Sequence, residues 1–375
     1  MDTRDASGAP EPTPEPTPTP TLEPTPAPGA VPAPEEPVRL RLSTPEDLLA
    51  AVPVLLGFEP ADSLVLLTFT APGAPRGPQL RVDLPDAGDA VALDELVDLV
   101  LAPCVRHRVE RVAMVLYTVA ERAAATVADA LVPALLDVGV DVVTVVAADG
   151  RTWWRVDDPA GALGMPAVRT AYRVDAHPIR ADAVVRGQVV HASRAELAAT
   201  LAPHETRQTR VTRAARDERR RDRARTSAAE TAWVAGTVSD LVRRRLAPPT
   251  GASDRRTTVD LDPATAARLL LALEVGVNRD AAWRGLDRAT AQAHHDLWTD
   301  LLRCAPAGLR AAPAALVALT SWLLGNGALA WCGVDACLEE APQHGLGCLV
   351  RDLLVAATPP TWWEEVATLV HGDPA

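Results

Sequence analysis

The chain is 375 residues long, with 48% apolar, 23% charged and 3% aromatic side chains. This mixture is typical of a globular protein, and it excludes a collagen-like chain and a chain that is disordered throughout. The formal net charge of -12 at pH 7 argues against a protein that coats nucleic acid generally.

The basic and sulfur-containing residues report on genome composition and compartment. All 37 basic residues are arginine, and isoleucine occurs once, as Ile179. Because lysine and isoleucine have AT-rich codons, we ascribe this bias to a GC-rich genome rather than to guanidinium chemistry. Five cysteines in a chain of this length form no disulfide framework, which indicates a reducing compartment.

The first 37 residues differ in composition from the rest. Residues 1–37 contain twelve prolines, seven acidic residues and one arginine. Such a segment buries too little apolar surface to offset the entropy lost on ordering, so we expect a disordered tail. The segment also lacks the basic start and the apolar run of a secretory signal, which predicts a cytoplasmic protein.

From residue 38 the sequence alternates between β-like runs and amphipathic helices. We expect strands at residues 38–42, 64–70, 80–84, 111–119, 141–147 and 151–156, and helices at residues 45–56, 89–107 and 121–138. The turn-rich segment between the second and third strands predicts a hairpin. Strands that alternate with helices of this length indicate right-handed βαβ crossovers. We therefore predict an α/β domain at residues 38–203, with a mostly parallel sheet and helices on both faces.

Local capping signals set some of these boundaries. Residues 43–47 supply a cap, a proline in the first turn and acidic residues at the positive end of a helix dipole, and Gly57 ends that helix. Ser193 and Glu196 have the spacing of a capping box, which predicts the helix that closes the domain near Pro203.

Residues 204–225 are rich in arginine. Five arginines recur every three residues: Arg207, Arg210, Arg213, Arg216 and Arg219. On a helix this spacing places the arginines in a row that turns slowly around the helix axis. Such a helix is either an arm that binds phosphate backbones or a solvated linker between domains. Acidic residues within the run and the lack of interleaved aromatic side chains favour the linker, so nucleic acid is not an expected partner.

The remaining residues, 226–375, predict an all-helical domain. Residues 302–306 recur in part as residues 338–342, and two apolar helical stripes flank the turn at residues 325–327. This pattern loosely resembles the tetratricopeptide helix-turn-helix, although two partial copies are fewer than the three or so repeats that a free solenoid needs.

Two other interpretations compete for this hairpin. Residues 311–334 carry no charge and are long enough to cross a bilayer. The turn interrupts them at the centre, which favours two buried helices and no membrane span. Residues 325–330 also fit a dinucleotide-binding fingerprint, but helices rather than strands surround them, so we predict no cofactor there.

Several segments together carry a family resemblance. They are residues 42–49, 52–65, 81–85, 149–154 and 325–330. They resemble an actinobacterial family, the domain of unknown function four-one-nine-two, over residues 38–363. The resemblance implies no activity, because none is assigned to that family. Many members carry clustered cysteines after the tryptophan pair, but this chain has none at residues 156–161, so any metal or redox role of that cluster is absent here.

The polar residues of the first motif give a candidate ligand-binding site. They are Glu59, Asp62, Ser63, Arg81 and Asp83. Arg81 and Asp83, two apart on a strand, share a face and could frame an anionic or amide ligand. In the alternative interpretation, which we favour, Asp62 caps the turn and Arg81 pairs with it, so that the residues hold the hairpin.

Trp153 and Trp154 complete the candidate site. Adjacent residues on a strand point to opposite faces, so one indole belongs to the core and the other is a binding platform. We assign Trp154 to the candidate site.

Other potential reactive groups do not form a recognised signature. Four residues near the C-terminus lack the spacing of zinc ligands: Cys332, Cys337, His344 and Cys348. Residues 294–296, His-His-Asp, are interpreted as a surface face of a helix. Ser63 lacks the glycines of a nucleophile elbow. We assign no catalytic residue, no cofactor and no metal.

Two classes of function remain open. The first, which we favour, is a non-enzymatic interaction or regulatory protein that binds a protein partner through its helical domain. The second is an α/β enzyme or a small-ligand-binding protein with a site at the carboxyl ends of the strands, where crossover loops form a crevice.

Overall fold

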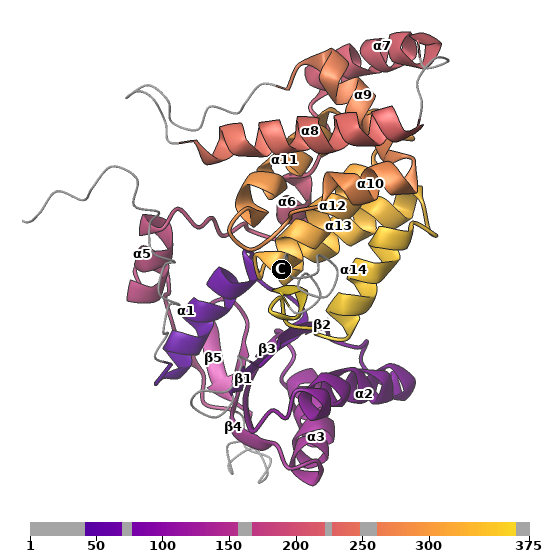
Figure 1. Cartoon of the computed structure of the whole chain (residues 1–375). Coiled ribbons are helices and arrows are strands. Elements are labelled where there is room, and N and C mark those ends of the chain that lie inside the picture. The colour runs from indigo at the N-terminus through magenta and orange to yellow at the C-terminus, as the bar shows by residue number, and fades with distance from the viewer. Residues whose placement is uncertain (1–41, 70–76, 157–166, 222–226, 248–260, 365–375) are drawn as a thin grey trace, which may run out of the picture. The chain divides into compact units, whose positions relative to one another are not determined.

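The computed structural model describes residues 42–69, 77–156, 167–221, 227–247 and 261–364 (Figure 1). The tail predicted at residues 1–37 and all but Leu42 of the first predicted strand lie outside the described residues. The sheet and its helices are α1 (Pro45–Leu56), β1 (Ser63–Phe69), β2 (Gln79–Asp83), α2 (Ala90–Arg106), β3 (Arg111–Tyr117), α3 (Glu121–Asp137), β4 (Asp141–Ala148), β5 (Thr152–Arg155), β6 (Thr170–Ala171), α5 (Pro178–Val185) and α6 (Arg194–Ala199).

The described strands form one mixed sheet in the order β2-β1-β3-β4-β5-β6. Within it, β3 and β4 pair in parallel, while the other four pairs are antiparallel. The prediction of a mostly parallel sheet is therefore wrong. Both α2 and α3 do connect strands that run in the same direction, but β1 lies between β2 and β3, so only the α3 connection yields adjacent parallel strands.

Helices cover both faces of this sheet, as predicted. On one face Leu49 and Val52 of α1 pack against Val65 and Val115. On the other face the apolar side chains of α2 and α3 pack against a second set, which includes Met114. Because successive strand residues point to opposite faces, Val115 and Met114 belong to different cores. We call these the α1 face and the α2/α3 face.

The start of α1 shows why the sequence predicted its boundaries well. The Thr44 hydroxyl accepts a hydrogen bond from the backbone of Asp47, and the Asp47 carboxylate accepts one from the backbone of Thr44, which is a complete capping box. Gly57 ends the helix with a φ of 78°, a left-handed conformation that glycine adopts without a steric cost.

The second half of the described chain is helical, as predicted. Its helices are α7 (Glu205–Arg221), α8 (Ser227–Leu246), α9 (Pro263–Leu273), α10 (Gly276–Ala282), α11 (Ala291–Cys304), α12 (Ala311–Leu323), α13 (Gly327–Glu340) and α14 (Gly345–Val355). Within the predicted linker, α7 buries Val211 and Ala215 and packs against α9 and α11. The domain boundaries at residues 203 and 225 stay predictions.

The predicted hairpin is formed by α12 and α13, and its likeness to a tetratricopeptide repeat stays a prediction. All residues of α12 are buried. The two helices cross closely at Gly333, where a Cβ would lie 2.9 Å from the backbone nitrogen of Ala318. None of the described helices is long and apolar enough to span a membrane.

Candidate functional site

The candidate residues meet at one end of the sheet, where β1 begins and β2 and β3 end. Ser63, the first residue of β1, pairs with Asp83 on one side and with Tyr117 on the other. Arg81 pairs with Val65, which belongs to the α1 face. The side chains of Ser63, Arg81, Asp83 and Tyr117 therefore share the α1 face.

The segment that enters β1 is fixed by backbone hydrogen bonds. Glu59 N donates to His191 O over 2.9 Å, and His191 N donates to the carbonyl of Gly57 over the same distance. Asp62 has a φ of 43°, a left-handed conformation that aspartate tolerates better than most residues, and its carbonyl accepts a hydrogen bond from Leu84 N. Asp62 therefore joins the start of β1 to the end of β2.

Arg81 and Asp83 form an ion pair of 2.6 Å between Nη2 and Oδ1, so they do share a face as predicted. The Arg81 guanidinium also lies over the Phe58 ring, 5.9 Å from its centroid. No ion pair between Arg81 and Asp62 is present in this described segment, and the Asp62 side chain is exposed. The Ser63 hydroxyl is buried and donates to the carbonyl of Ala61 over 2.8 Å.

Glu59 pairs with a residue that the sequence did not indicate. Its carboxylate accepts a hydrogen bond from Arg180 Nη2 of α5. The two tyrosines of the chain, Tyr117 and Tyr172, lie on the same face of the sheet. We call these four residues the tyrosine–arginine cluster.

Electrostatics couple the members of the tyrosine–arginine cluster. Burial raises the pKa of Tyr117 well above its usual value, and the charges of Tyr172 and Glu59 raise it further, while Arg180 lowers it. Burial also raises the pKa of Tyr172 to about 12, again with a contribution from Glu59. Both phenols are therefore protonated near neutral pH and can donate hydrogen bonds.

Trp154 does not belong with the other candidates. It is buried on the α2/α3 face, and β5 lies three strand spacings, about 14 Å, from β1. The Arg169 guanidinium stacks on its ring at 4.0 Å from the centroid, and Arg169 also pairs with Asp149 and Glu121. One indole does lie on each face as predicted, since Trp153 packs on the α1 face.

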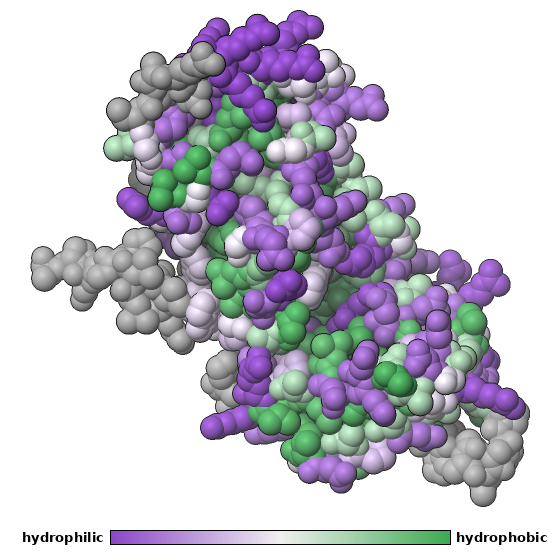
Figure 2. All heavy atoms as spheres, turned by 90° about the vertical axis from the view of Figure 1, so that its right-hand side faces the viewer, coloured by the Kyte–Doolittle hydropathy of each residue, from purple (hydrophilic) through white to green (hydrophobic). Residues whose placement is uncertain are grey.

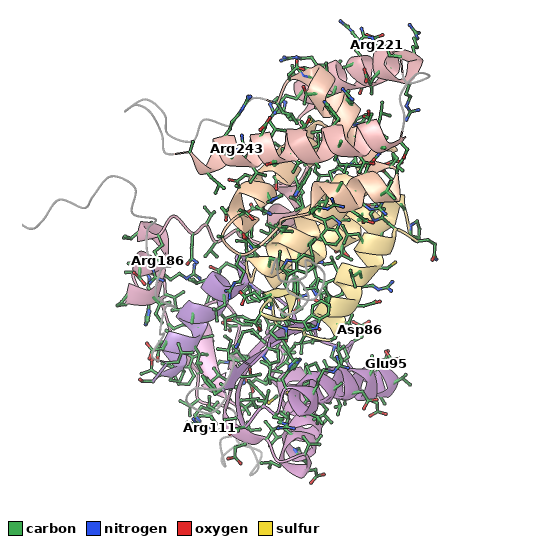
Figure 3. All side chains as sticks on the ribbon, viewed as in Figure 1. Asp86, Glu95, Arg111, Arg186, Arg221 and Arg243 are labelled. Carbon is green, nitrogen blue, oxygen red and sulfur yellow. The ribbon has the colours of Figure 1, made fainter. Side chains whose placement is uncertain are left out.

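The arginine-rich helix α7 presents a second candidate surface. Four exposed arginines lie along the solvent-facing surface of the helix: Arg210, Arg213, Arg216 and Arg220. The last three lie opposite the buried residues, Arg210 lies at the edge of this surface, and the exposed Asp217 lies among them. We call them the arginine face. These four residues have no ion pair in the described part of the chain. Figure 2 shows hydrophilic residues gathered at the top of the molecule, where Figure 1 places α7. Figure 3 shows side chains that project outward there, around Arg221.

The remainder of α7 is fixed in place. Arg245 of α8 donates to the Asp300 carboxylate over 3.0 Å, and Arg207 of α7 lies 3.8 Å from the same group. Gln208 Nε2 donates to the carbonyl of Ala305 over 2.8 Å. The arginine face is therefore carried on a helix that packs against α9 and is tied to α11.

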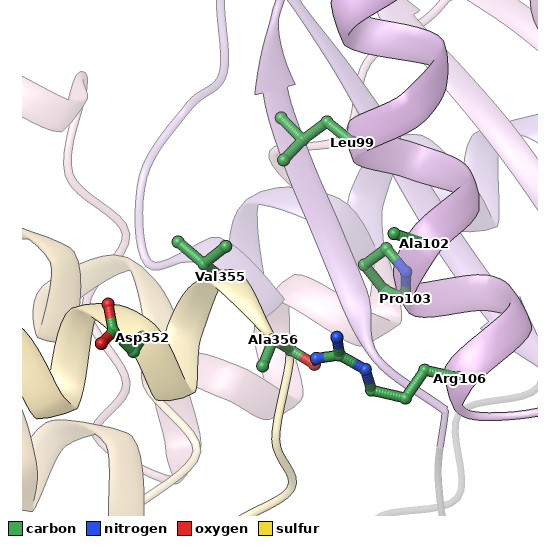
Figure 4. A pocket seen from close by; sticks show the side chains of 7 residues that line it. All are labelled: Leu99, Ala102, Pro103, Arg106, Asp352, Val355 and Ala356. Atoms are coloured by element: carbon green, nitrogen blue, oxygen red, sulfur yellow. The ribbon is translucent and has the colours of Figure 1, made fainter.

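A groove of about 330 Å³ lies between α2 and α14 rather than at the strand ends (Figure 4). Its lining is mostly apolar and includes Leu99, Pro103 and Val355. Arg106 Nη1 donates to the carbonyl of Ala356 over 3.2 Å. This arginine thereby satisfies a free carbonyl at the end of α14, which is a structural role.

The histidines of α11 correct one prediction. His294 was expected on a surface face, but it is buried, and burial lowers its pKa to about 4. The prediction was wrong because α11 packs against α7, α8, α9 and α12, and these contacts between distant segments are not visible in the local sequence. Across the described segments, no three His, Cys, Asp or Glu side chains come together to hold a metal ion. All five cysteines are free thiols.

Sequence reasoning missed Arg180, Tyr117 and Tyr172. Arg180 lies 121 residues from its partner Glu59, and no local pattern connects residues at that distance. The one available signal was composition, because the chain has only two tyrosines and both lie in this cluster.

The chain is thus an α/β protein with a mixed sheet, followed by a helical region. It belongs to the family described as Domain of unknown function (DUF4192), which matches residues 45–361 and confirms the family resemblance. No curated protein and no solved structure matches the chain.

Proposed function

We propose that this protein is a non-enzymatic, cytoplasmic interaction protein that binds an acidic segment of a partner protein on the arginine face of α7. The observation that carries the proposal is the row of four exposed guanidinium groups without ion pairs in the described chain. Their Cα atoms span about 15 Å along the helix axis, the length of about five extended residues.

Two properties of α7 support a specific partner rather than a solvated face. Its buried residues Val211 and Ala215, its packing against α9 and its ties to α11 hold the helix in position before any partner binds. A surface that is already ordered loses less conformational entropy on binding. Guanidinium groups also bind carboxylates in a bidentate geometry, which favours Asp-rich and Glu-rich segments.

An acidic protein segment fits better than nucleic acid. The whole chain carries a net charge of -12, which repels every polyanion. This repulsion is larger for a long polyphosphate that extends beyond α7 than for a segment of about five residues that contacts the arginine face alone. In addition, α7 contains no aromatic side chain on which a base could stack.

The second class of function draws less support. An α/β enzyme or ligand-binding protein would place its site at the strand ends, but there the charged candidates are paired within the chain, Arg81 with Asp83 and Glu59 with Arg180, so that no charge is left for an ionic substrate.

Fluorescence anisotropy tests the proposal. A labelled glutamate-rich peptide should bind the full chain in a salt-dependent manner, and reversing Arg213, Arg216 and Arg220 to Glu should weaken binding at least about tenfold. The matched control reverses three exposed arginines elsewhere, Arg122, Arg151 and Arg173, and should retain binding.

Two outcomes would contradict the proposal. Equal weakening by both triple variants would show a net-charge effect without a docking surface. If duplex DNA of equal charge binds more tightly than the peptide, and only the α7 variant loses this binding, the partner is nucleic acid rather than an acidic protein segment.

A further inference from the structure

Two hydrogen-bond donors in the tyrosine–arginine cluster are buried without a partner. They are the hydroxyl of Tyr117 and Nε of Arg180. Tyr117 is 6% exposed, and the Arg180 side chain is 15% exposed. A buried donor without an acceptor costs about 1 to 3 kcal/mol, more when it is charged, so native chains retain few of them. Here two occur in groups that also influence each other electrostatically.

An acceptor with free capacity lies beside these donors. The Glu59 side chain is 45% exposed and uses one carboxylate oxygen, Oε1, for Arg180. Its second oxygen remains available to a hydrogen-bond donor. The cluster therefore offers two donors and one acceptor, contributed by β3, by α5 and by the segment that follows α1.

The two charges within the cluster balance, because Arg180 neutralises Glu59. An added anion would have to displace the Glu59 carboxylate from Arg180 or lie next to it unpaired. A neutral ligand meets neither cost.

Access to the cluster depends on α5. This helix has eight residues and buries one of them, Ala183. It is attached through Arg180 to Glu59 and through its N-cap residue His177 to Asp47 of α1. Besides its packing against α1, two partly exposed polar contacts hold this short helix, so its opening costs little compared with opening of the cores.

We infer that the tyrosine–arginine cluster binds a small neutral ligand that carries a carboxamide-type group, with α5 as its cover. The ligand carbonyl accepts hydrogen bonds from Tyr117 Oη and Arg180 Nε, and the ligand N–H donates to Glu59. This site lies on the α1 face and is independent of the arginine face of α7.

Because the chain contains only two tyrosines, fluorine-labelled tyrosine can report on this cluster. Because Tyr117 and Tyr172 are the only tyrosines, replacing tyrosine by 3-fluorotyrosine gives two ¹⁹F resonances, both from this cluster. Tyr117→Phe and Tyr172→Phe assign them. Acetamide and acetate are nearly isosteric, one neutral and one anionic, and each is titrated into the labelled full chain.

The expected result is a saturable shift of the Tyr117 resonance with acetamide and a response at least about fivefold weaker with acetate. Arg180→Gln should abolish the acetamide response. The matched control Arg169→Gln, a guanidinium on the α2/α3 face, should retain it. Far-ultraviolet circular dichroism establishes that each variant is folded.

Three results would overturn the inference. An equal or stronger response to acetate would make the site anionic. If the Tyr117 resonance shows no saturable shift with either acetamide or acetate, its hydroxyl does not bind a ligand. An acetamide response that survives Arg180→Gln would remove Arg180 from the site.

Discussion

The helices α12 and α5 differ in how deeply they are buried and in whether the polar groups around them are paired. Every residue of α12 is buried, and its N-terminus is satisfied by Glu340, whose carboxylate accepts hydrogen bonds from the backbone of Gly308, Arg310 and Ala311. By contrast, α5 buries one residue and lies beside donors that remain unpaired. The carboxylate at the N-terminus of α12 therefore holds the fold, whereas the Tyr117 hydroxyl and Arg180 Nε are the two donors that we assign to a ligand.

The largest expected effect comes from the close crossing of α12 and α13. Gly333→Val should destabilise the chain by about 3 kcal/mol or more, because a Cβ there lies within 3.0 Å of backbone atoms of Ala314 and Ala318. Urea unfolding measures this change. The control is Gly236→Ala in α8, where a Cβ meets no atom within 4 Å and stability should stay equal or rise. Equal loss in both variants would contradict the tight crossing.

Buried histidine makes the helical region sensitive to mild acid. Burial lowers the pKa of His294 to about 4, whereas the unfolded chain takes up that proton near pH 6.5. Stability is therefore complete above pH 6.5 and falls as the pH decreases towards 4, by about 2 kcal/mol for His294 between pH 7 and pH 5. Unfolding at these two pH values measures the loss.

His294→Gln should reduce this pH dependence. A part should remain in the variant, because burial and the Arg279 charge also lower the pKa of His344 to about 4. An unchanged pH profile in His294→Gln would contradict the burial of a neutral histidine.

The carboxylate of Glu340 gives the next effect. Glu340→Gln keeps the side-chain size but replaces one carboxylate oxygen by an NH₂ group, which cannot accept the backbone hydrogen bonds at α12. We expect a loss of about 1 to 2 kcal/mol in thermal or urea unfolding. Glu339→Gln, at the exposed neighbouring position, is the control and should change stability by less than about 0.5 kcal/mol. A similar loss in both would exclude the capping role.

How much the sequence predicted depends on the distance over which each interaction acts. The boundaries of α1 were predictable because Thr44, Asp47 and Gly57 act within one turn of the helix ends. The turn between α12 and α13 was equally local. The sheet order was not, because the position of β1 between β2 and β3 is decided by packing across the whole domain.

The candidate site follows the same division. Arg81 and Asp83 were placed on one face by strand periodicity alone. The contact between Arg180 and Glu59 is made only by the folded chain. The position of Trp154 on the other face of the sheet, away from the other candidates, is likewise decided by the fold. The exposed arginines of α7 were visible in the sequence, but the buried side that orients them was not.

The smallest expected effects are gains at two helix ends. Arg108, after α2, and Ala357, after α14, both have a φ of 49°, a left-handed conformation that strains residues with a Cβ. Arg108→Gly and Ala357→Gly should each raise stability by about 0.5 to 1 kcal/mol in thermal unfolding. Loss of stability in both would show that their side chains contribute more than the strain costs.

Arginine footprinting tests the central claim, the role of the arginine face, most directly. Because every basic side chain of the chain is arginine, phenylglyoxal labelling followed by mass spectrometry reports on the whole basic surface. With the glutamate-rich peptide bound, we predict labelling of Arg213, Arg216 and Arg220 slowed at least about fivefold, and labelling of Arg122 and Arg151 unchanged. Uniform slowing of all arginines, or protection confined to residues outside α7, would contradict the account.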